Sequence, residues 1–148
     1  MRWRGPLCAA ALITPLTGCA GGAVEVAAPE RADDPACRSV PWPQALGDLP
    51  RRETTGGDAV AAWGDPAVIA RCGLPSQGPT TLECVAVNDV DWVLRELSDG
   101  YGFVTYGTDP ALEVLVPAAY APETMLLTDF TALATALPGT GRSCIAPS

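Results

Sequence analysis

The chain has 148 residues, with 17 acidic residues against 9 arginines and neither lysine nor histidine, so its net charge is −8. Without histidine it lacks the Ser-His-Asp and Cys-His catalytic sets and any imidazole metal ligand, and without lysine it lacks a Schiff base and a P-loop cation. An acidic chain with no basic stripe argues against nucleic acid as a partner. Composition therefore favours a protein that is not an enzyme and uses no cofactor or metal.

The N-terminus has the pattern of an export signal. Two arginines in the first four residues precede an uncharged, mostly apolar stretch at residues 7–17. A stretch of about 7–15 apolar residues is typical of a signal peptide, whereas a membrane span needs about 20. The sequence LTGC at residues 16–19 resembles the bacterial lipobox, which implies cleavage before Cys19 and diacylglycerol on its sulfur. The alternative is an ordinary signal peptide with a chance cysteine.

We therefore expect residues 1–18 to be removed, Cys8 with them, and the mature protein to be held by its lipid on the extracytoplasmic face of the cell membrane. Residues 20–36 are small, charged and interrupted by proline, which predicts a disordered tether. Such a tether, fully extended, would reach at most about 55–60 Å. The single folded domain is expected to span residues 37–148.

The beginning of this domain is rich in proline. A short helical turn is expected at residues 44–49, between two of the prolines. Trp42, with a proline on either side, has two interpretations. It is either an exposed aromatic ring that contacts a ligand or, more commonly, a ring that packs a loop onto the core.

The middle of the chain predicts an antiparallel meander of about five strands. Turn-forming dipeptides such as Asn88-Asp89 and Asp99-Gly100 separate the apolar stretches. The stretch at residues 90–97 also fits a helical stripe, but the hairpin turns beside it favour a strand. The predicted strands are residues 67–72, 82–87, 90–97, 101–106 and 111–117.

A C-terminal helix is predicted at residues 122–137, since apolar residues line one face and Pro138-Gly139 follows. One helix on one face of the sheet gives an α+β fold with Trp63, Trp92 and Phe103 in its core. The other face of the sheet needs cover from loops, or it is exposed.

Four cysteines remain after the signal and the lipidated position, and an even number in an exported chain predicts two disulfides. Three pairings exist. The predicted strands that end at Cys72 and begin near Cys84 are neighbours across a turn, so we predict Cys72–Cys84, which leaves Cys37–Cys144.

A tryptophan-glycine pair, a proline and an Arg-Cys-Gly tripeptide occur in AAWGDPAVIARCG at residues 61–73. Together they resemble the domain of unknown function 3515 family, small exported proteins and lipoproteins of high-GC Gram-positive bacteria with an RCG motif. The resemblance covers about residues 37–137. It implies an envelope location and a shared fold, and no catalytic residue. Arg71 either pairs with a carboxylate or contacts an anionic ligand; Cys72 forms a bridge and Gly73 allows the chain to turn.

Two functions are compatible with these residues. The first is a non-catalytic envelope module that binds another envelope protein, a cell-wall component or a small ligand. The second is a small hydrolase that uses Asp89 and Asp91, which would lie on the same side of a strand. Two acidic residues beside a hairpin are more often a solvated turn, which favours the binding module.

Overall fold

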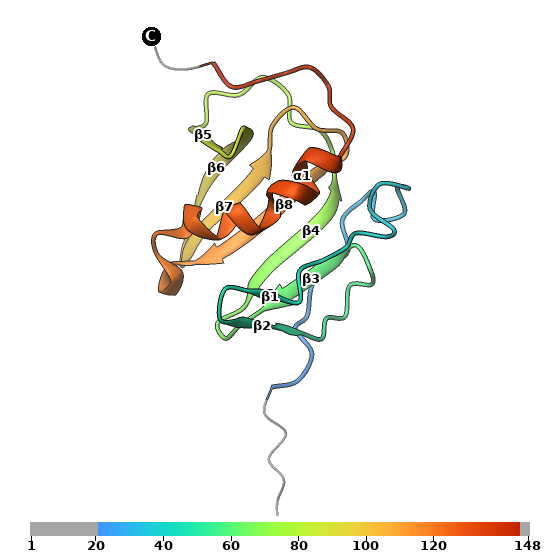
Figure 1. Ribbon diagram of the computed structural model, residues 1–148, viewed down its shortest axis with the longest axis vertical. Helices are drawn as coiled ribbons and strands as arrows, with labels where there is room; N and C mark the ends of the chain where they lie inside the picture. Colours follow the sequence, from blue (N-terminus) through green and yellow to red (C-terminus); the bar gives the residue numbers. More distant parts are fainter. Residues whose placement is uncertain (1–20, 146–148) are drawn as a thin grey trace, which may run out of the picture.

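Eight antiparallel strands and a C-terminal helical segment make up the fold that the computed structural model describes for residues 21–145 (Figure 1). The predicted signal peptide and Cys19 lie outside the described residues. Within residues 21–145, no helix combines the length and apolar character needed to cross a membrane. The strands are β1 (Ala45–Leu46), β2 (Leu49–Arg52), β3 (Val60–Trp63), β4 (Val68–Leu74), β5 (Cys84–Val87), β6 (Val90–Leu97), β7 (Gly100–Thr105) and β8 (Ala111–Pro117).

The strand order is β1-β2-β3-β4-β8-β7-β6-β5. Strands β5 to β8 form the predicted meander, but β4 pairs with β8 and not with β5. The predicted hairpin between residues 67–72 and 82–87 is therefore wrong. Residues 75–83 instead carry the chain from β4, past three intervening strands, to β5 at the far edge of the sheet.

Three strands were missing from the prediction. The expected helical turn at residues 44–49 is wrong, because β1 and β2 form a hairpin whose two-residue turn is Gly47-Asp48. Gly47 has φ +54, a conformation that favours glycine and that suits a tight hairpin. The Gly-Asp dipeptide was the signal for this turn, and it was overlooked beside the prolines.

The predicted hairpins further along the chain are confirmed, although the second turn is Ser98-Asp99, because Gly100 already pairs with Leu97 as the first residue of β7. Asn88 and Asp89 have φ values of 49° and 63°, as a two-residue turn of this hand requires, and β5 pairs with β6 around them. Residues 90–97 form strand β6 over their whole length, so the helical alternative is wrong.

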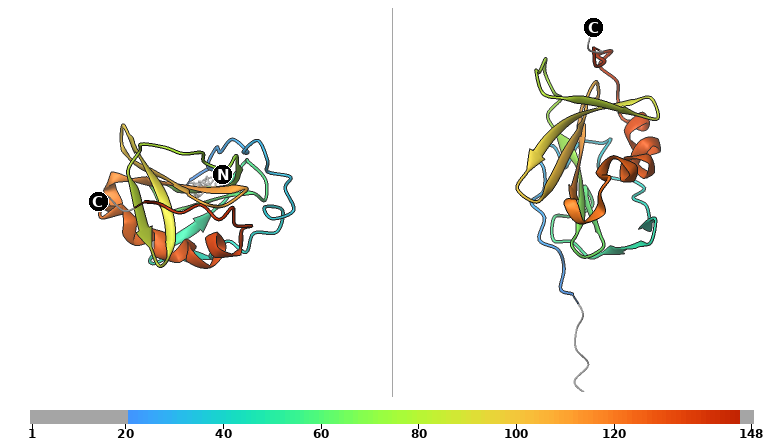
Figure 2. Two further views of the ribbon diagram at one scale, coloured as in Figure 1. Left: turned by 90° about the horizontal axis from the view of Figure 1, so that it is seen from above. Right: turned by 90° about the vertical axis from the view of Figure 1, so that its left-hand side faces the viewer.

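The helical segment consists of η1 (Ala118–Tyr120), η2 (Glu123–Phe130) and α1 (Thr131–Ala136). A helix at residues 122–137 is thus confirmed in position, although its first half is 3₁₀. The segment lies on one side of the sheet (Figure 2). It ends before Pro138 because a residue that precedes proline disfavours the α conformation, and Leu137 is accordingly extended.

The main core lies between the sheet and this segment. Leu127 and Phe130 are fully buried, and the Phe130 ring meets the edge of Trp63 at a centroid distance of 5.5 Å. Trp63, Trp92 and Phe103 are buried as predicted. Since strand side chains alternate between the two faces, the residues between these core positions point to the second face of the sheet.

Two disulfides are present as predicted, but the predicted pairing is wrong. Cys37 is bonded to Cys72 and Cys84 to Cys144, with Cα–Cα distances of 5.4 Å and 6.2 Å. The physical reason is the strand order. Cys72 on β4 and Cys84 on β5 belong to strands that do not neighbour each other.

The tether prediction is wrong from Val24 onward. Val24 forms a parallel bridge with Thr54, Val26 is buried, and the Arg31 N–H donates to the Gly73 carbonyl at 2.9 Å. The folded domain therefore begins at Val24, well before Cys37. This segment and the loop that follows β4 together cover parts of the second face of the sheet. The sequence predicted that loops would cover that face or leave it exposed.

Candidate binding site

The Arg-Cys-Gly tripeptide lies at the end of β4, and its arginine pairs with a carboxylate on β8. Arg71 is directly opposite Glu113 in the strand register. Arg71 Nε donates to Glu113 Oε2 at 2.7 Å, and Nη2 of the same guanidinium contacts that oxygen too. The expected carboxylate partner of Arg71 is thus confirmed.

The other two residues of the tripeptide attach the N-terminal segment to the sheet. Cys72 bonds to Cys37, as described above. Gly73 has φ +117, and a Cβ there would lie 2.6 Å from the carbonyl carbon of Arg31. Gly73 does not turn the chain as expected. It sits at a bulge in β4, where the missing side chain lets the backbone of Arg31 approach.

A second arginine reaches the same carboxylate from β6. Arg95 Nη2 donates to Glu113 Oε1 at 2.9 Å, so Glu113 holds one guanidinium with each oxygen. The residue opposite Arg95 on β7 is Gly102, and a Cβ there would come within 3.5 Å of Arg95 Nη2. Gly102 therefore leaves the space through which the arginine side chain crosses β7 to β8.

The three side chains differ sharply in exposure. Glu113 is 1% exposed, Arg71 26% and Arg95 52%. A carboxylate this buried needs paired charges, since an isolated one would pay a large desolvation penalty. With two guanidiniums on one carboxylate the cluster has a net charge of +1, and Arg95 brings that charge to the surface.

Beside Arg95 is a hollow of about 160 Å³ on the second sheet face. Val93 and Val104 form its buried apolar floor. Leu82, one of the most exposed large apolar residues of the described chain, stands at its wall with 49% of its surface accessible. The full lining is Leu74, Gln77, Leu82, Val93, Arg95, Val104 and Glu113.

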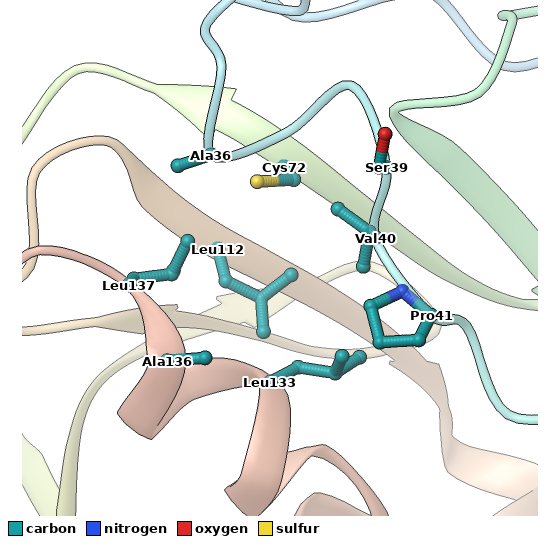
Figure 3. A pocket seen from close by; sticks show the side chains of 9 residues that line it. All are labelled: Ala36, Ser39, Val40, Pro41, Cys72, Leu112, Leu133, Ala136 and Leu137. Atoms are coloured by element: carbon teal, nitrogen blue, oxygen red, sulfur yellow. The ribbon is translucent and has the colours of Figure 1, made fainter.

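A second hollow, of about 190 Å³, lies on the helical side of the sheet (Figure 3). It is bordered by the chain at residues 36–41 and by the last turn of α1, with Cys72 and Leu112 on the sheet behind. Its walls are almost wholly apolar, and no charged side chain lines it. Ser39 brings a hydroxyl to its lining but no charge that would hold an ionic ligand, so the hollow at Arg95 is the stronger candidate.

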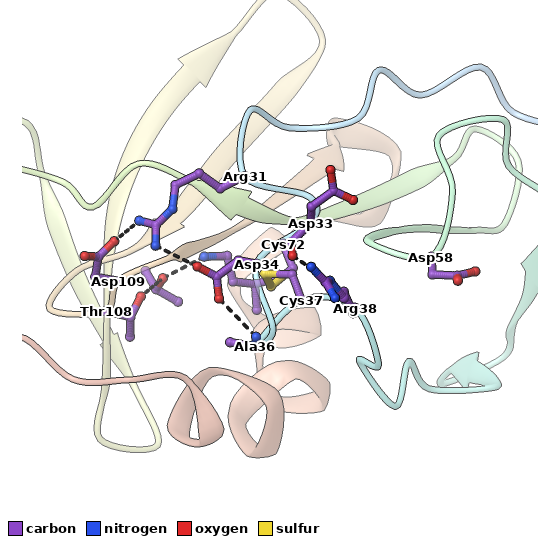
Figure 4. Close-up of a disulfide and its surroundings, with 12 residues drawn as sticks. Arg31, Asp33, Asp34, Ala36, Cys37, Arg38, Asp58, Cys72, Thr108 and Asp109 are labelled. Atoms are coloured by element: carbon purple, nitrogen blue, oxygen red, sulfur yellow. Dashed lines mark hydrogen bonds and ion pairs between the residues drawn. A yellow bond between two sulfur atoms is a disulfide. The ribbon is translucent and has the colours of Figure 1, made fainter.

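The N-terminal segment is held by an ion-pair cluster next to the Cys37–Cys72 bridge (Figure 4). Arg31 donates to Asp34 at 2.7 Å and also contacts Asp109, in the loop before β8. The hydrogen bonds to Asp109 and Asp34 raise the pKa of Arg31. The pKa of Asp34 is lowered, first by the hydrogen bond from the Ala36 N–H and then by that from Arg31.

We expect acid to loosen this segment. A carboxyl whose pKa is depressed by folding stabilises the fold above its ordinary pKa, here 3.8, and loses that contribution as the pH falls through the lowered folded value. The amides of Ala36 and Cys37 should therefore lose protection against hydrogen exchange, corrected for intrinsic rates, as the pH falls below the lowered pKa of Asp34. Asp34→Ala, which removes the acceptor oxygens, should show the loss already near neutral pH. Unchanged protection in Asp34→Ala would contradict the role given to this carboxylate.

The other residues singled out from the sequence have structural surroundings. Trp42 is buried, packs edge-on to Trp63 at 6.2 Å and donates from Nε1 to the Asp58 carbonyl at 2.8 Å, so the ligand-contact interpretation is wrong and the core interpretation is confirmed. Asp91 accepts a hydrogen bond from the Cys144 N–H at 2.8 Å.

Asp89 lies in the hairpin turn and outside β6, so the alternation that was expected to align it with Asp91 does not apply. Neither Asp89 nor Asp91 lines either of the two hollows described above. Within residues 21–145, no three acidic or cysteine side chains gather in a way that would hold a metal ion.

Sequence reasoning missed Glu113 and Arg95, which complete the cluster. A signal for Glu113 was present, because it is the one charged residue in the apolar stretch ALEVLVP. A carboxylate inside a buried strand needs a cationic partner, and a chain with only nine arginines and no lysine offers few.

Comparison with known proteins gives one match. Residues 7–139 match a family described as a protein of unknown function, DUF3515. No curated protein and no solved structure matches the chain.

Proposed function

The chain therefore belongs to the DUF3515 family, and we propose that it is a lipid-anchored envelope lipoprotein that acts as a non-catalytic binding module. The lipobox-like residues 16–19 support the anchor. The binding role rests on one observation above all. A half-exposed arginine, Arg95, is fixed by the buried Glu113 beside a hollow with apolar walls.

The fold bears on where the anchor would hold the domain. The bridged Val24 is five positions beyond Cys19, and five fully extended residues span at most about 18 Å. The chain enters the domain near β2 and leaves it at the opposite end (Figure 1). In this proposal the β2 end lies close to the bilayer, far closer than a disordered tether to Cys37 would hold it.

Lipidation can be tested on the full chain expressed in a Gram-positive host with its membranes intact. We expect the mature protein to begin at Cys19, to carry a diacylglycerol in its intact mass and to sediment with membranes. Cys19→Ala should abolish the added mass and the processing. Cys8→Ala is the matched control, because Cys8 lies in the discarded signal, and it should leave both unchanged.

An unmodified thiol at Cys19, in a protein recovered from the soluble fraction, would contradict the anchor. Globomycin, which blocks lipoprotein signal cleavage, should shift the intact mass upward by the signal peptide. The absence of that shift would point to ordinary secretion.

A further inference from the structure

We propose that the hollow beside Arg95 binds a small monocarboxylate that carries a compact apolar body. The inference deepens the binding role proposed above and rests on it. The carboxylate would lie on the Arg95 guanidinium at the rim, and the apolar body would lie on Val93 and Val104.

The charge of the cluster selects a single negative charge. Glu113 neutralises one of the two guanidiniums that it holds, so one positive charge is left for a ligand. The chain as a whole is strongly acidic, with a net charge of −8, and repels an anion of higher charge. A monocarboxylate therefore matches the site better than a phosphate dianion does.

Arg95 has the donors to receive it. A guanidinium carries five N–H groups in a planar fork, and Glu113 takes one bond from Nη2 of Arg95. Each edge of a guanidinium pairs one N–H of Nη2 with an N–H of Nε or Nη1, so the bond from Nη2 to Glu113 occupies one edge. The second N–H of Nη2 and its neighbour on the other edge remain, and a planar carboxylate can accept two parallel bonds from them.

The arginine is already held in position. The bond to Glu113 fixes the far end of its side chain, the space over Gly102 admits its stem, and Glu113 is itself fixed by Arg71. Binding would thus cost little of the side-chain entropy that a free surface arginine loses. Arg71 acts here as a positioning residue.

The size of the hollow limits the apolar body. Its volume is about 160 Å³, and an apolar cavity of about 150 Å³ is known to hold benzene. A phenyl ring or a branched chain of about four to six carbons fits that volume. Such a body would also cover the exposed side of Leu82.

Calorimetry with the purified full chain tests this with four probes. Benzoate and isovalerate have both the charge and the apolar body; acetate has only the charge, and benzyl alcohol has only the body. We expect benzoate and isovalerate to bind at least tenfold more tightly than acetate, benzyl alcohol or inorganic phosphate, at low ionic strength. Equal affinities for acetate and benzoate, or tighter binding of phosphate, would overturn the proposal.

Matched variants locate the site. Arg95→Gln should weaken benzoate binding at least tenfold, whereas Arg51→Gln, which removes the same charge from an exposed position elsewhere, should not change it. Leu82→Ala should weaken it severalfold, while Met125→Ala, at a still more exposed apolar residue, should not. Arg95→Gln leaves the Arg71–Glu113 pair intact, so its thermal melting should remain cooperative.

Equal losses in the Arg95 and Arg51 variants would show that only overall charge matters and would refute the site. So would the absence of any heat of binding for benzoate at about 10 mM. These titrations do not depend on lipidation, whereas the mass of the mature terminus does not depend on ligand. A failure of one proposal is therefore distinguishable from a failure of the other.

Discussion

Replacing Cys37 and Cys72 together by alanine is expected to lower the free energy of unfolding by about 4 kcal/mol or more. The bridge closes a loop of 35 residues, and its loss returns that conformational entropy to the unfolded chain. Both cysteines are also fully buried in the main core, so their packing is lost as well. For a domain with a total stability of about 5–15 kcal/mol, this is a severe loss.

The second bridge provides the comparison. Cys84–Cys144 spans 60 residues, so loop entropy alone would make it slightly the more stabilising of the two, at about 4 kcal/mol. It lies at the partly exposed edge of the sheet and ties down only the C-terminal end. We expect the Cys37/Cys72 variant to be the less stable in urea unfolding, because burial outweighs loop length. The opposite order would contradict this account, and a non-reducing peptide map should recover Cys37 joined to Cys72.

Glu113→Ala is expected to lower the free energy of unfolding by about 3 kcal/mol. It leaves two guanidiniums facing each other, with the partly buried Arg71 deprived of its partner. Glu96→Ala, at an exposed carboxylate on β6, is the control and should change stability by no more than about 0.5 kcal/mol. Unfolding in guanidinium chloride, with the m-values compared, measures the free energy of unfolding of both variants.

A triple variant separates charge from packing. Arg71→Met, Glu113→Leu and Arg95→Met together remove the ion pairs but keep apolar volume, so they should recover most of the stability lost in Glu113→Ala. The same variant should lose its preference for benzoate over benzyl alcohol. A triple variant as unstable as Glu113→Ala would indicate that side-chain packing, and not the unpaired charges, causes the loss.

The sequence predicts some strands of the sheet and misses others. The meander from β5 to β8 was predicted, because Asn88-Asp89 and Asp99-Gly100 are turn signals confined to a few residues. The Gly47-Asp48 hairpin was equally local and was missed beside Pro41, Pro43 and Pro50. The candidate site was only half visible: Arg71 stood out in its motif, while Arg95 and Glu113 did not.

The sequence by itself determined the local features: the turns, the C-terminal helix with its proline stop, the core tryptophans and the presence of two disulfides. Only the tertiary structure decided which distant segments meet. Arg71 and Glu113 are 42 residues apart, and they pair because β8 returns to lie beside β4. The same strand order separates Cys72 from Cys84, and Cys72 is bonded instead to Cys37 in the N-terminal segment. Turn and helix preferences act over a few neighbouring residues, whereas strand order depends on the burial of the whole sheet, and no short stretch of sequence contains it.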